Sequence, residues 1–214
     1  ERRHIVAIDQ YGAHDEFELT RFEGAQDKTR AFVKIQDGCN QFCSYCIIPY
    51  ARGRLRSKPI DALKDEVSRL AQSGRREIVL VGINLAFYGV EFGLRLADAV
   101  EVCCKTEGIE RVRLGSLEPE ILSDEDLRRL AALPELCPQF HLSLQSGSEN
   151  TLKAMNRKYT AADYFTLTQK IRAAFPNASF TTDIMVGFPT ETEEDFAESM
   201  RFAEKIGFAK IHVF

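Results

Sequence analysis

The chain has 214 residues, of which 44% are hydrophobic and 28% charged, and its formal net charge is -4. This length and composition predict one globular domain with a sizeable core, with or without a short appendage. The net charge excludes a chain whose whole surface binds nucleic acid, and apolar runs such as 78–83 are too short to cross a bilayer. No signal peptide opens the chain, so we expect a cytoplasmic protein.

Residues 1–30 carry no motif of their own and are expected to form an N-terminal extension or a linker remnant. The chain begins without Met, and it stops inside the strand-like run AKIHVF. We therefore expect a piece of a longer protein.

From residue 31 onward, β-branched or apolar runs alternate with amphipathic helical stretches. The alternation predicts repeated βα units with right-handed crossovers, which form a partial (β/α)6 barrel of parallel strands over residues 31–214, truncated at its last strand. Ser123, Thr160 and Thr192 are expected to cap the last three helices. The expected strands are 31–36, 77–82, 111–116, 139–145, 179–187 and 209–214, and the expected helices are 59–73, 94–106, 124–132, 161–174 and 193–206.

Six cysteines are too few and too unevenly spread for a disulfide framework, so we expect a reducing compartment and metal ligation. Cys103 and Cys104 lie on a predicted helix, where a free cysteine packs like a small hydrophobic residue. Cys137, in a loop beside Pro138, is also expected to be structural.

Cys39, Cys43 and Cys46 form the pattern C-x3-C-x2-C on the loop that leaves the first strand. Ligands of open α/β sheets bind at this carboxyl end of the strands. Thiolates suit iron–sulfur clusters, and three of them leave one iron of a four-iron cluster open to a small molecule. A zinc site completed by a distant His or by Cys137, or an uncomplexed trio, is the alternative.

The cysteine spacing, with Tyr45 before the third cysteine, resembles the signature of radical S-adenosylmethionine (SAM) enzymes. The segments GCNQFCSYCIIPYARGRLRSKP, GINLAFYG, GSLEPE, LSLQSGSENTLKAMNRKYT and TTDIMVGFPTETEEDF follow successive strands and resemble the methylthiotransferase family. The resemblance implies a [4Fe-4S] cluster on the three cysteines and reductive cleavage of SAM to a 5′-deoxyadenosyl radical, used to methylthiolate a modified adenosine in tRNA.

The same resemblance implies that the loops after the strands bind SAM. Asn84 could accept from the methionyl ammonium, and Arg157 could pair with the methionine carboxylate or be merely solvated. Asp183 is expected to bind ribose hydroxyls or Arg157, while His141 is either a satisfied core histidine or part of the barrel lining. Strand alternation would place Ser143 and Gln145 on one face. The expected cofactor residues are Gly82, Asn84, Tyr88, Ser116, Glu118, Ser143, Gln145, Arg157, Asp183 and Gly187.

The run ARGRLRSK places Arg52, Arg54, Arg56 and Lys58 at alternate positions, on one side if the run is extended. This is either a solvated basic edge or a contact with RNA phosphates. The pattern ARG-x-x-RS resembles the branch that modifies threonylcarbamoyladenosine.

Full-length members of that family carry an N-terminal domain with three further cysteines and a C-terminal RNA-binding barrel, and neither pattern is found in this sequence. We therefore expect a fragment that is inactive alone and that needs tRNA and an electron donor as partners of the full-length protein. No membrane contact is expected. The alternatives are a radical enzyme acting on a ribosomal protein or a small molecule, and an iron–sulfur or zinc binding module without radical chemistry.

Overall fold

The structure is a computed structural model that describes residues 16–19, 29–120 and 122–214. The extension predicted for residues 1–30 therefore lies mostly outside the described residues. Within it, Phe17 is buried, and the ammonium groups of Lys34 and Lys58 lie 5.7 and 5.5 Å from the centre of its ring.

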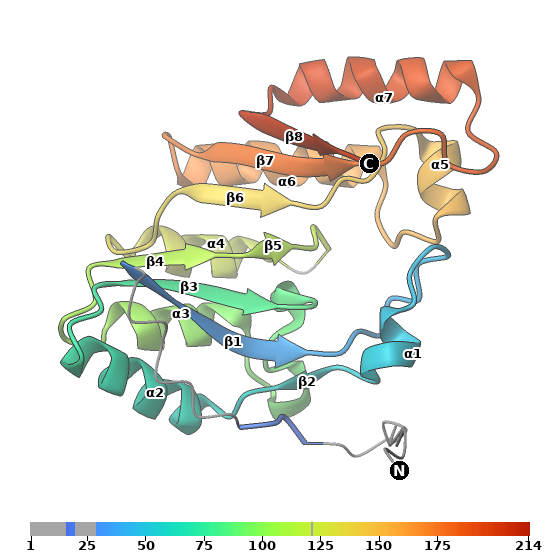
Figure 1. Cartoon of the computed structure of the whole chain (residues 1–214). Helices are drawn as coiled ribbons and strands as arrows, with labels where there is room; N and C mark the ends of the chain where they lie inside the picture. The colour runs from blue at the N-terminus through green and yellow to red at the C-terminus, as the bar shows by residue number, and fades with distance from the viewer. Residues whose placement is uncertain (1–15, 20–28, 121) are drawn as a thin grey trace, which may run out of the picture.

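The strands form two four-stranded sheets that follow one another in a single curled layer (Figure 1). All neighbouring strands are parallel except β2, which is antiparallel to β1 and was not predicted. The partial parallel barrel expected from the sequence is confirmed. The first sheet has the order β2 (Arg56–Ser57), β1 (Arg30–Asp37), β3 (Glu77–Gly82), β4 (Arg111–Leu114), and the second β5 (Ser116–Leu117), β6 (Gln139–Leu142), β7 (Ser179–Ile184), β8 (Lys210–Val213).

The third predicted strand, 111–116, is not continuous, because it is divided at Gly115 into β4 and β5. β4 pairs with β3, whereas β5 pairs with β6. The Gly115 N–H donates to the carbonyl of Leu80 at 2.8 Å, and a Cβ at Gly115 would lie 3.1 Å from that oxygen. The pairing of β4 with β3 therefore ends at this close approach of Gly115 to Leu80, and the pairing of β5 with β6 begins after it.

Each of the five predicted helices is present, with slightly shorter bounds for the first three. Ser123, Thr160 and Thr192 each accept a hydrogen bond from the N–H three residues on, and the aspartate at that position bonds back, so these predicted caps are confirmed. The short helices α1 and α5 were not predicted. The helices are α1 (Ile48–Arg52), α2 (Ile60–Gln72), α3 (Leu96–Cys104), α4 (Asp124–Ala131), α5 (Glu149–Ala154), α6 (Ala161–Ala174) and α7 (Glu193–Ile206), with 3-10 turns η1 (Leu85–Phe87) and η2 (Val90–Phe92).

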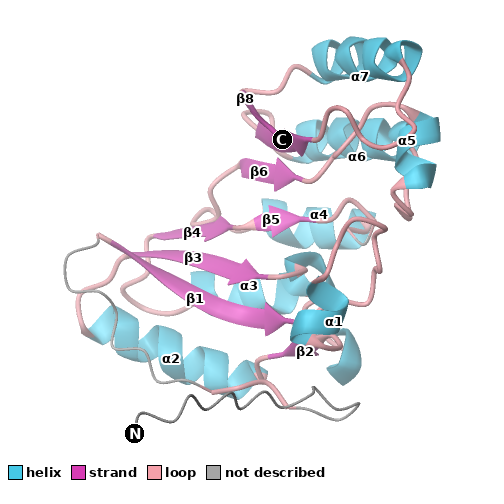
Figure 2. Cartoon of the chain, turned by 45° about the vertical axis from the view of Figure 1, so that its right-hand side comes forward, coloured by secondary structure: helices cyan, strands magenta, loops and turns pink. Residues whose placement is uncertain are grey.

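The hydrophobic core lies between the curled sheet and the long helices (Figure 2). Alternate strand residues such as Val33, Leu80 and Phe140 are fully buried in it, which leaves the other face of the sheet for polar side chains. Cys103 and Cys104 are buried on α3, as predicted, and burial raises the pKa of both thiols. Among the described residues, no helix has the length and apolar character needed to span a membrane.

Candidate functional site

The cysteine loop, residues 38–46, leaves the carboxyl end of β1 and is fixed at its base by the returning chain. β2 pairs Gln36 with Ser57 and Asp37 with Arg56, and the Cys39 N–H donates to the carbonyl of Gly53 at 3.2 Å. The loop is therefore anchored at both ends on the same sheet edge. Figure 1 shows α1, which follows the loop, on the side toward which the arrowheads of β1 and β3 point.

The Arg56 guanidinium is part of this anchor. It donates to the carbonyl of Arg52 at 2.7 Å and pairs with Asp37 at 3.2 Å. Lys58 is also buried and pairs with Glu66. The expected extended basic edge is therefore wrong: Arg52 ends helix α1, and Arg56 and Lys58 face inward, where buried cations need a partner. Arg52 and Arg54 remain exposed.

Two N–H groups point at the sulfur of Cys39. The Gln41 backbone N–H lies 3.4 Å from Cys39 Sγ, and the Asn84 Nδ2 lies 3.6 Å from it. The other end of that amide, Asn84 Oδ1, is buried without a hydrogen-bond partner in the described structure. A buried, unpaired acceptor beside the cysteine loop suits a donor such as an ammonium group. Burial raises the pKa of the Cys39 thiol.

A buried ion pair lies beside Cys43. The Arg157 Nη1 is 3.3 Å from Cys43 Sγ and 3.4 Å from the hydroxyl of Tyr45. Its Nη2 pairs with Glu118, and only 4% of the Arg157 side chain is exposed. The predicted residues Glu118 and Arg157 are thus brought together at the cysteine loop. Burial raises the pKa of Glu118 and of Tyr45, and the Arg157 guanidinium opposes both rises.

The donor set fits an iron–sulfur cluster with SAM better than a closed site for one ion. Within the described ranges, no three His, Cys, Asp or Glu side chains are gathered to hold a single metal ion. In a four-iron cluster each thiolate binds its own iron, so the thiolates need not converge. The three cysteines are half-buried free thiols, and two of their sulfurs already receive N–H donors. The unpaired Asn84 Oδ1 adds a hydrogen-bond acceptor beside the loop.

Asp183 faces the interior of the partial barrel but not Arg157. Its Oδ2 lies 3.3 Å from His141 Nε2, and its Oδ1 lies 3.9 Å from His212 Nδ1. His141 Nδ1 in turn lies 3.0 Å from the Thr181 hydroxyl. Of the two partners expected for Asp183, Arg157 is therefore wrong: His141 is hydrogen-bonded to the carboxylate, and His212 on the next strand lies within ion-pair distance. His141 belongs to the barrel lining.

The loop after β6 departs from the expected alternation. Gln145 has a φ of 67°, and its N–H donates to the carbonyl of Asp183 at 2.8 Å. Ser143 is 7% exposed, and its carbonyl accepts from the Tyr159 hydroxyl at 2.8 Å. A residue in the left-handed region breaks the period of two, so Ser143 and Gln145 do not share a face by strand geometry.

Two of the residues expected to bind the cofactor, Gly82 and Tyr88, instead make packing contacts within the fold. A Cβ at Gly82 would lie 2.9 Å from Cβ of Gln36, so this glycine allows β1 and β3 to pack closely. Tyr88 is fully buried and donates to the carbonyl of Lys58 at 2.8 Å. Its side chain is therefore not one of those gathered at the cysteine loop.

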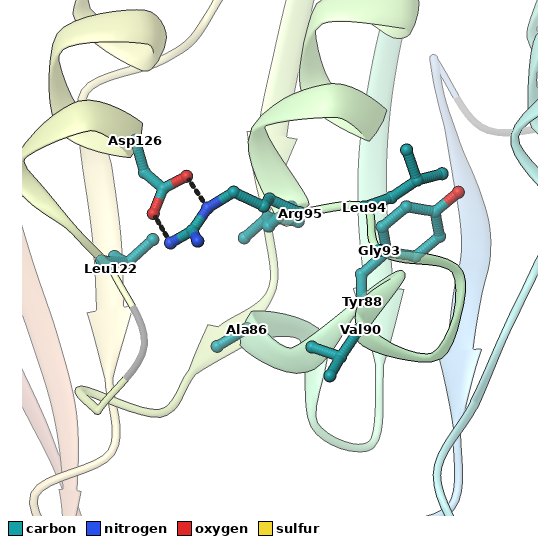
Figure 3. A pocket seen from close by; sticks show the side chains of 9 residues that line it. Ala86, Tyr88, Val90, Gly93, Leu94, Arg95, Leu122 and Asp126 are labelled. Atoms are coloured by element: carbon teal, nitrogen blue, oxygen red, sulfur yellow. Dashed lines mark hydrogen bonds and ion pairs between the residues drawn. The ribbon is translucent and has the colours of Figure 1, made fainter.

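Tyr88 instead lines a separate cavity of about 340 Å³ at the N-terminal ends of α3 and α4. Figure 3 shows Arg95 and Asp126, an ion pair, on one side of this cavity and the Tyr88 ring on the other. The pair joins the first turns of the two helices, and Leu94 and Leu122 supply much of the apolar wall.

The last two predicted residues lie at the same rim as the cysteine loop. Ser116 is exposed on β5 and is in register with His141. The Gly187 N–H donates to Glu191 at 2.6 Å, and the next residue, Phe188, packs edge-on against Tyr45 with ring centres 6.2 Å apart.

Two contacts of the cysteine loop could not be predicted from the sequence. Gln41 donates to Glu120 at 2.6 Å, and Asn156 donates to the carbonyl of Phe42 at 2.8 Å. These partners are 79 and 114 residues apart in the chain, so no local pattern signals them.

The chain belongs to the radical SAM superfamily, whose family model matches residues 33–203. It is 44% identical over 199 residues to threonylcarbamoyladenosine tRNA methylthiotransferase MtaB of Chlamydia pneumoniae, covering 93% of this chain and 46% of the relative. It is 43% identical over 187 residues to tRNA-2-methylthio-N(6)-dimethylallyladenosine synthase of Clostridium novyi, covering 86% and 41%. The predicted likeness to methylthiotransferases is confirmed, and the chain spans less than half the length of these relatives.

Solved structures share the fold. The radical SAM methyltransferase TsrM from Kitasatospora setae, with cobalamin and a [4Fe-4S] cluster bound, has a TM-score of 0.70 at 16% identity, over 85% of this chain and 36% of that one. Coproporphyrinogen III oxidase (HemN) from Escherichia coli, a radical SAM enzyme, has a TM-score of 0.61 at 18% identity, over 86% and 43%.

Proposed function

We propose that this chain is the SAM-cleaving module of a tRNA methylthiotransferase. The observation that carries the proposal is the loop with Cys39, Cys43 and Cys46, which has the unpaired Asn84 oxygen on one side and the buried Arg157 on the other. The named activities of the sequence relatives support the same reading.

In this proposal the three cysteines hold a [4Fe-4S] cluster, and Asn84 Oδ1 accepts from the ammonium of SAM. The bound cluster would supply one electron that breaks the sulfonium C–S bond, which yields methionine and a 5′-deoxyadenosyl radical. Asp183, oriented by His141 and His212, accepts from ribose hydroxyls. Ser116, Ser143, Gln145 and Gly187 complete the rim.

The proposed substrate is a modified adenosine in tRNA, and the threonylcarbamoyl form is favoured by the ARG-x-x-RS pattern at 51–57. The parent protein would work in the cytoplasm with an electron donor and with domains outside this chain that bind tRNA and supply sulfur.

Anaerobic reconstitution of the chain with ferrous iron and sulfide tests the cofactor part. We expect about four irons per chain and a change in the electron paramagnetic resonance (EPR) spectrum of the reduced cluster on adding SAM. Cys43→Ala should lose this cluster, whereas Cys104→Ala, a change at a buried structural thiol, should keep it. Binding of zinc alone, or a cluster that does not respond to SAM, would contradict the proposal.

The substrate part is tested with the parent protein on tRNA lacking the methylthio group. We expect product on tRNA carrying threonylcarbamoyladenosine and none with the Cys43→Ala variant. Product only on tRNA carrying dimethylallyladenosine would assign the protein to the branch that modifies that nucleoside. Product on neither tRNA would indicate a different substrate.

Arg52 and Arg54 are the exposed members of the basic run, and we propose that they contact tRNA phosphates. The double change Arg52→Ala with Arg54→Ala should weaken tRNA binding by the parent protein and reduce the slope of log affinity against log salt by about 2. Lys64→Ala with Arg69→Ala on α2 is the charge-matched control. An equal loss in both double variants would argue against a local contact.

A further inference from the structure

A segment far along the chain holds the cysteine loop from its outer side. The Ser44 N–H donates to the carbonyl of Met155 at 3.0 Å, and the Ser44 hydroxyl donates to that of Ala154 at 2.9 Å. Asn156 bonds to the carbonyl of Phe42, and both of these residues have left-handed φ values, 58° and 51°. We call residues 154–157 the clamp.

Arg157 is the last residue of the clamp, and its side chain contacts polar and aromatic groups of the site. Besides Cys43 Sγ, Tyr45 and Glu118, its Nε donates to the Tyr159 hydroxyl at 3.1 Å, and its guanidinium lies 4.9 Å from the centre of the Tyr159 ring. The side chain is therefore held in one position and has little room to swing toward solvent.

The positive charge of Arg157 is fixed 3.3 Å from Cys43 Sγ. It therefore stabilises any negative charge added to the iron that this thiolate would bind. Reduction adds one negative charge to an iron–sulfur cluster, and hydrogen bonds to the sulfurs together with nearby charges set its potential. Because the Arg157 side chain is almost fully buried, solvent screens the interaction less than it would at the surface. Arg157 therefore favours the reduced state, while the carboxylate of Glu118 opposes it.

We propose that the Arg157–Glu118 pair sets the reduction potential of the cluster through the Arg157 contact with Cys43. This inference rests on the proposed function, since it requires the cluster. Arg157 raises the reduction potential, and Glu118 lowers it. Tyr159 and the clamp hold the Arg157 guanidinium close to Cys43 Sγ.

The test is an EPR-monitored redox titration at pH 8 of the reconstituted chain and its variants. Arg157→Gln should lower the equilibrium constant for reduction at least tenfold, which for one electron is about 59 mV. Glu118→Gln keeps an acceptor for Arg157 but removes the negative charge, and it should shift the potential in the opposite direction. Arg157→Lys should fall between the wild type and Arg157→Gln.

Arg113→Gln is the charge-matched control, because it removes the same charge from an ion pair with Glu77, the first residue of β3, at the opposite end of that strand from the cysteine loop. Its potential should equal that of the wild type. Iron and sulfide content, measured for each variant, shows whether the cluster is retained.

Shifts of the same sign in Arg157→Gln and Glu118→Gln would mean that the pair acts only on loop structure, and would overturn the inference. So would unchanged potentials in both. If the wild-type chain takes up no four-iron cluster, the proposed function fails; if it takes up the cluster and responds to SAM but neither variant shifts, only the inference about the pair fails.

Discussion

Gly38 lies where β1 ends and the cysteine loop begins, and its φ is 68°. A Cβ there would lie 1.9 Å from the carbonyl oxygen of Arg54 and 2.9 Å from that of Gly53. The glycine is required both by its backbone conformation and by the returning chain, which cannot move away without breaking the β1–β2 pairing.

Gly38→Ala should therefore lower the free energy of unfolding by about 3 kcal/mol, at the upper end of ordinary single changes. Gly74→Ala is the control, because Gly74 has a φ of 87° and no atom within 4 Å of the added Cβ. It should cost only the left-handed backbone penalty of about 1 kcal/mol. Urea denaturation measures both, and equal losses would show that the steric contact at Gly38 is relieved at no cost.

The positions of the side chains at the rim could be predicted from the sequence better than their partners could. The cysteines, Asn84 and Glu118 follow strands, and Asp183 lies near the carboxyl end of one, so all of them had to lie at one end of the sheet. Whether Arg157 pairs with Glu118 or with Asp183 depends on how far each side chain reaches across the barrel. His212, and not Arg157, lies beside Asp183, because β8 pairs with β7 and places the two residues in register.

Helix caps are the elements of this fold that were easiest to predict. At the start of α6, the Thr160 hydroxyl accepts from the Asp163 N–H at 3.0 Å, and Asp163 accepts from the Thr160 N–H at 3.0 Å. Both hydrogen bonds join two residues three positions apart, so the cap requires no contact with the rest of the chain.

Thr160→Ala should cost about 1 kcal/mol of unfolding free energy, the usual value of an N-cap. The control is Thr166→Ala, an exposed position within the same helix, where alanine is neutral or slightly stabilising. Urea denaturation of the two variants checks this, and a loss at Thr166 as large as that at Thr160 would mean that the cap contributes nothing of its own.

Asp195 in the first turn of α7 gives the stability of the chain a pH dependence. Hydrogen bonds from Ser148 first, and then from Thr192 and Asn150, hold the pKa of the Asp195 carboxyl well below its usual range. The folded state thus binds this proton less readily than the unfolded state does. The contribution is present above the unfolded pKa of about 4 and is lost as the pH falls through that value toward the lower folded pKa.

Asp195→Asn should therefore be less stable than the wild type at pH 7, and the difference between the two should narrow as the pH falls below about 4. Denaturation of the apo chain at a series of pH values measures it, with the exposed Glu204→Gln on the same helix as the charge-matched control. A difference that stays constant with pH would show that ionisation of Asp195 is not the cause.

Short elements are where prediction from the sequence failed. α1, α5 and β2 span five, six and two residues, too few to show a period in hydrophobicity. The break at Gly115 was also missed, because RVRLGS has the composition of an uninterrupted strand. Each of these features depends on contacts with distant segments, such as β2 with β1 or the end of α5 with Ser44.

For the whole molecule, the clamp joins the first and second halves of the chain at the rim. Asn156→Gly should increase the rate of hydrogen exchange at the Ser44 amide, which donates to Met155, because the neighbouring tether to Phe42 is lost. Exchange at strand amides such as that of Leu80 should not change. An equal increase at both would mean that the variant lowers global stability and does not act locally.

The break at Gly115 has a consequence for the rim as a whole. Cys39 and Asn84 follow strands of the first sheet, and Ser143 and Asp183 lie at the ends of strands of the second, so the two sides of the site come from different sheets. Within each side, distances are fixed by strand pairing. Between them, backbone hydrogen bonds of Val112 with Glu135 and Cys137 tie β4 to the segment that enters β6, and the clamp spans the opening at the rim, so the width of the site depends on these connections and not on strand pairing alone.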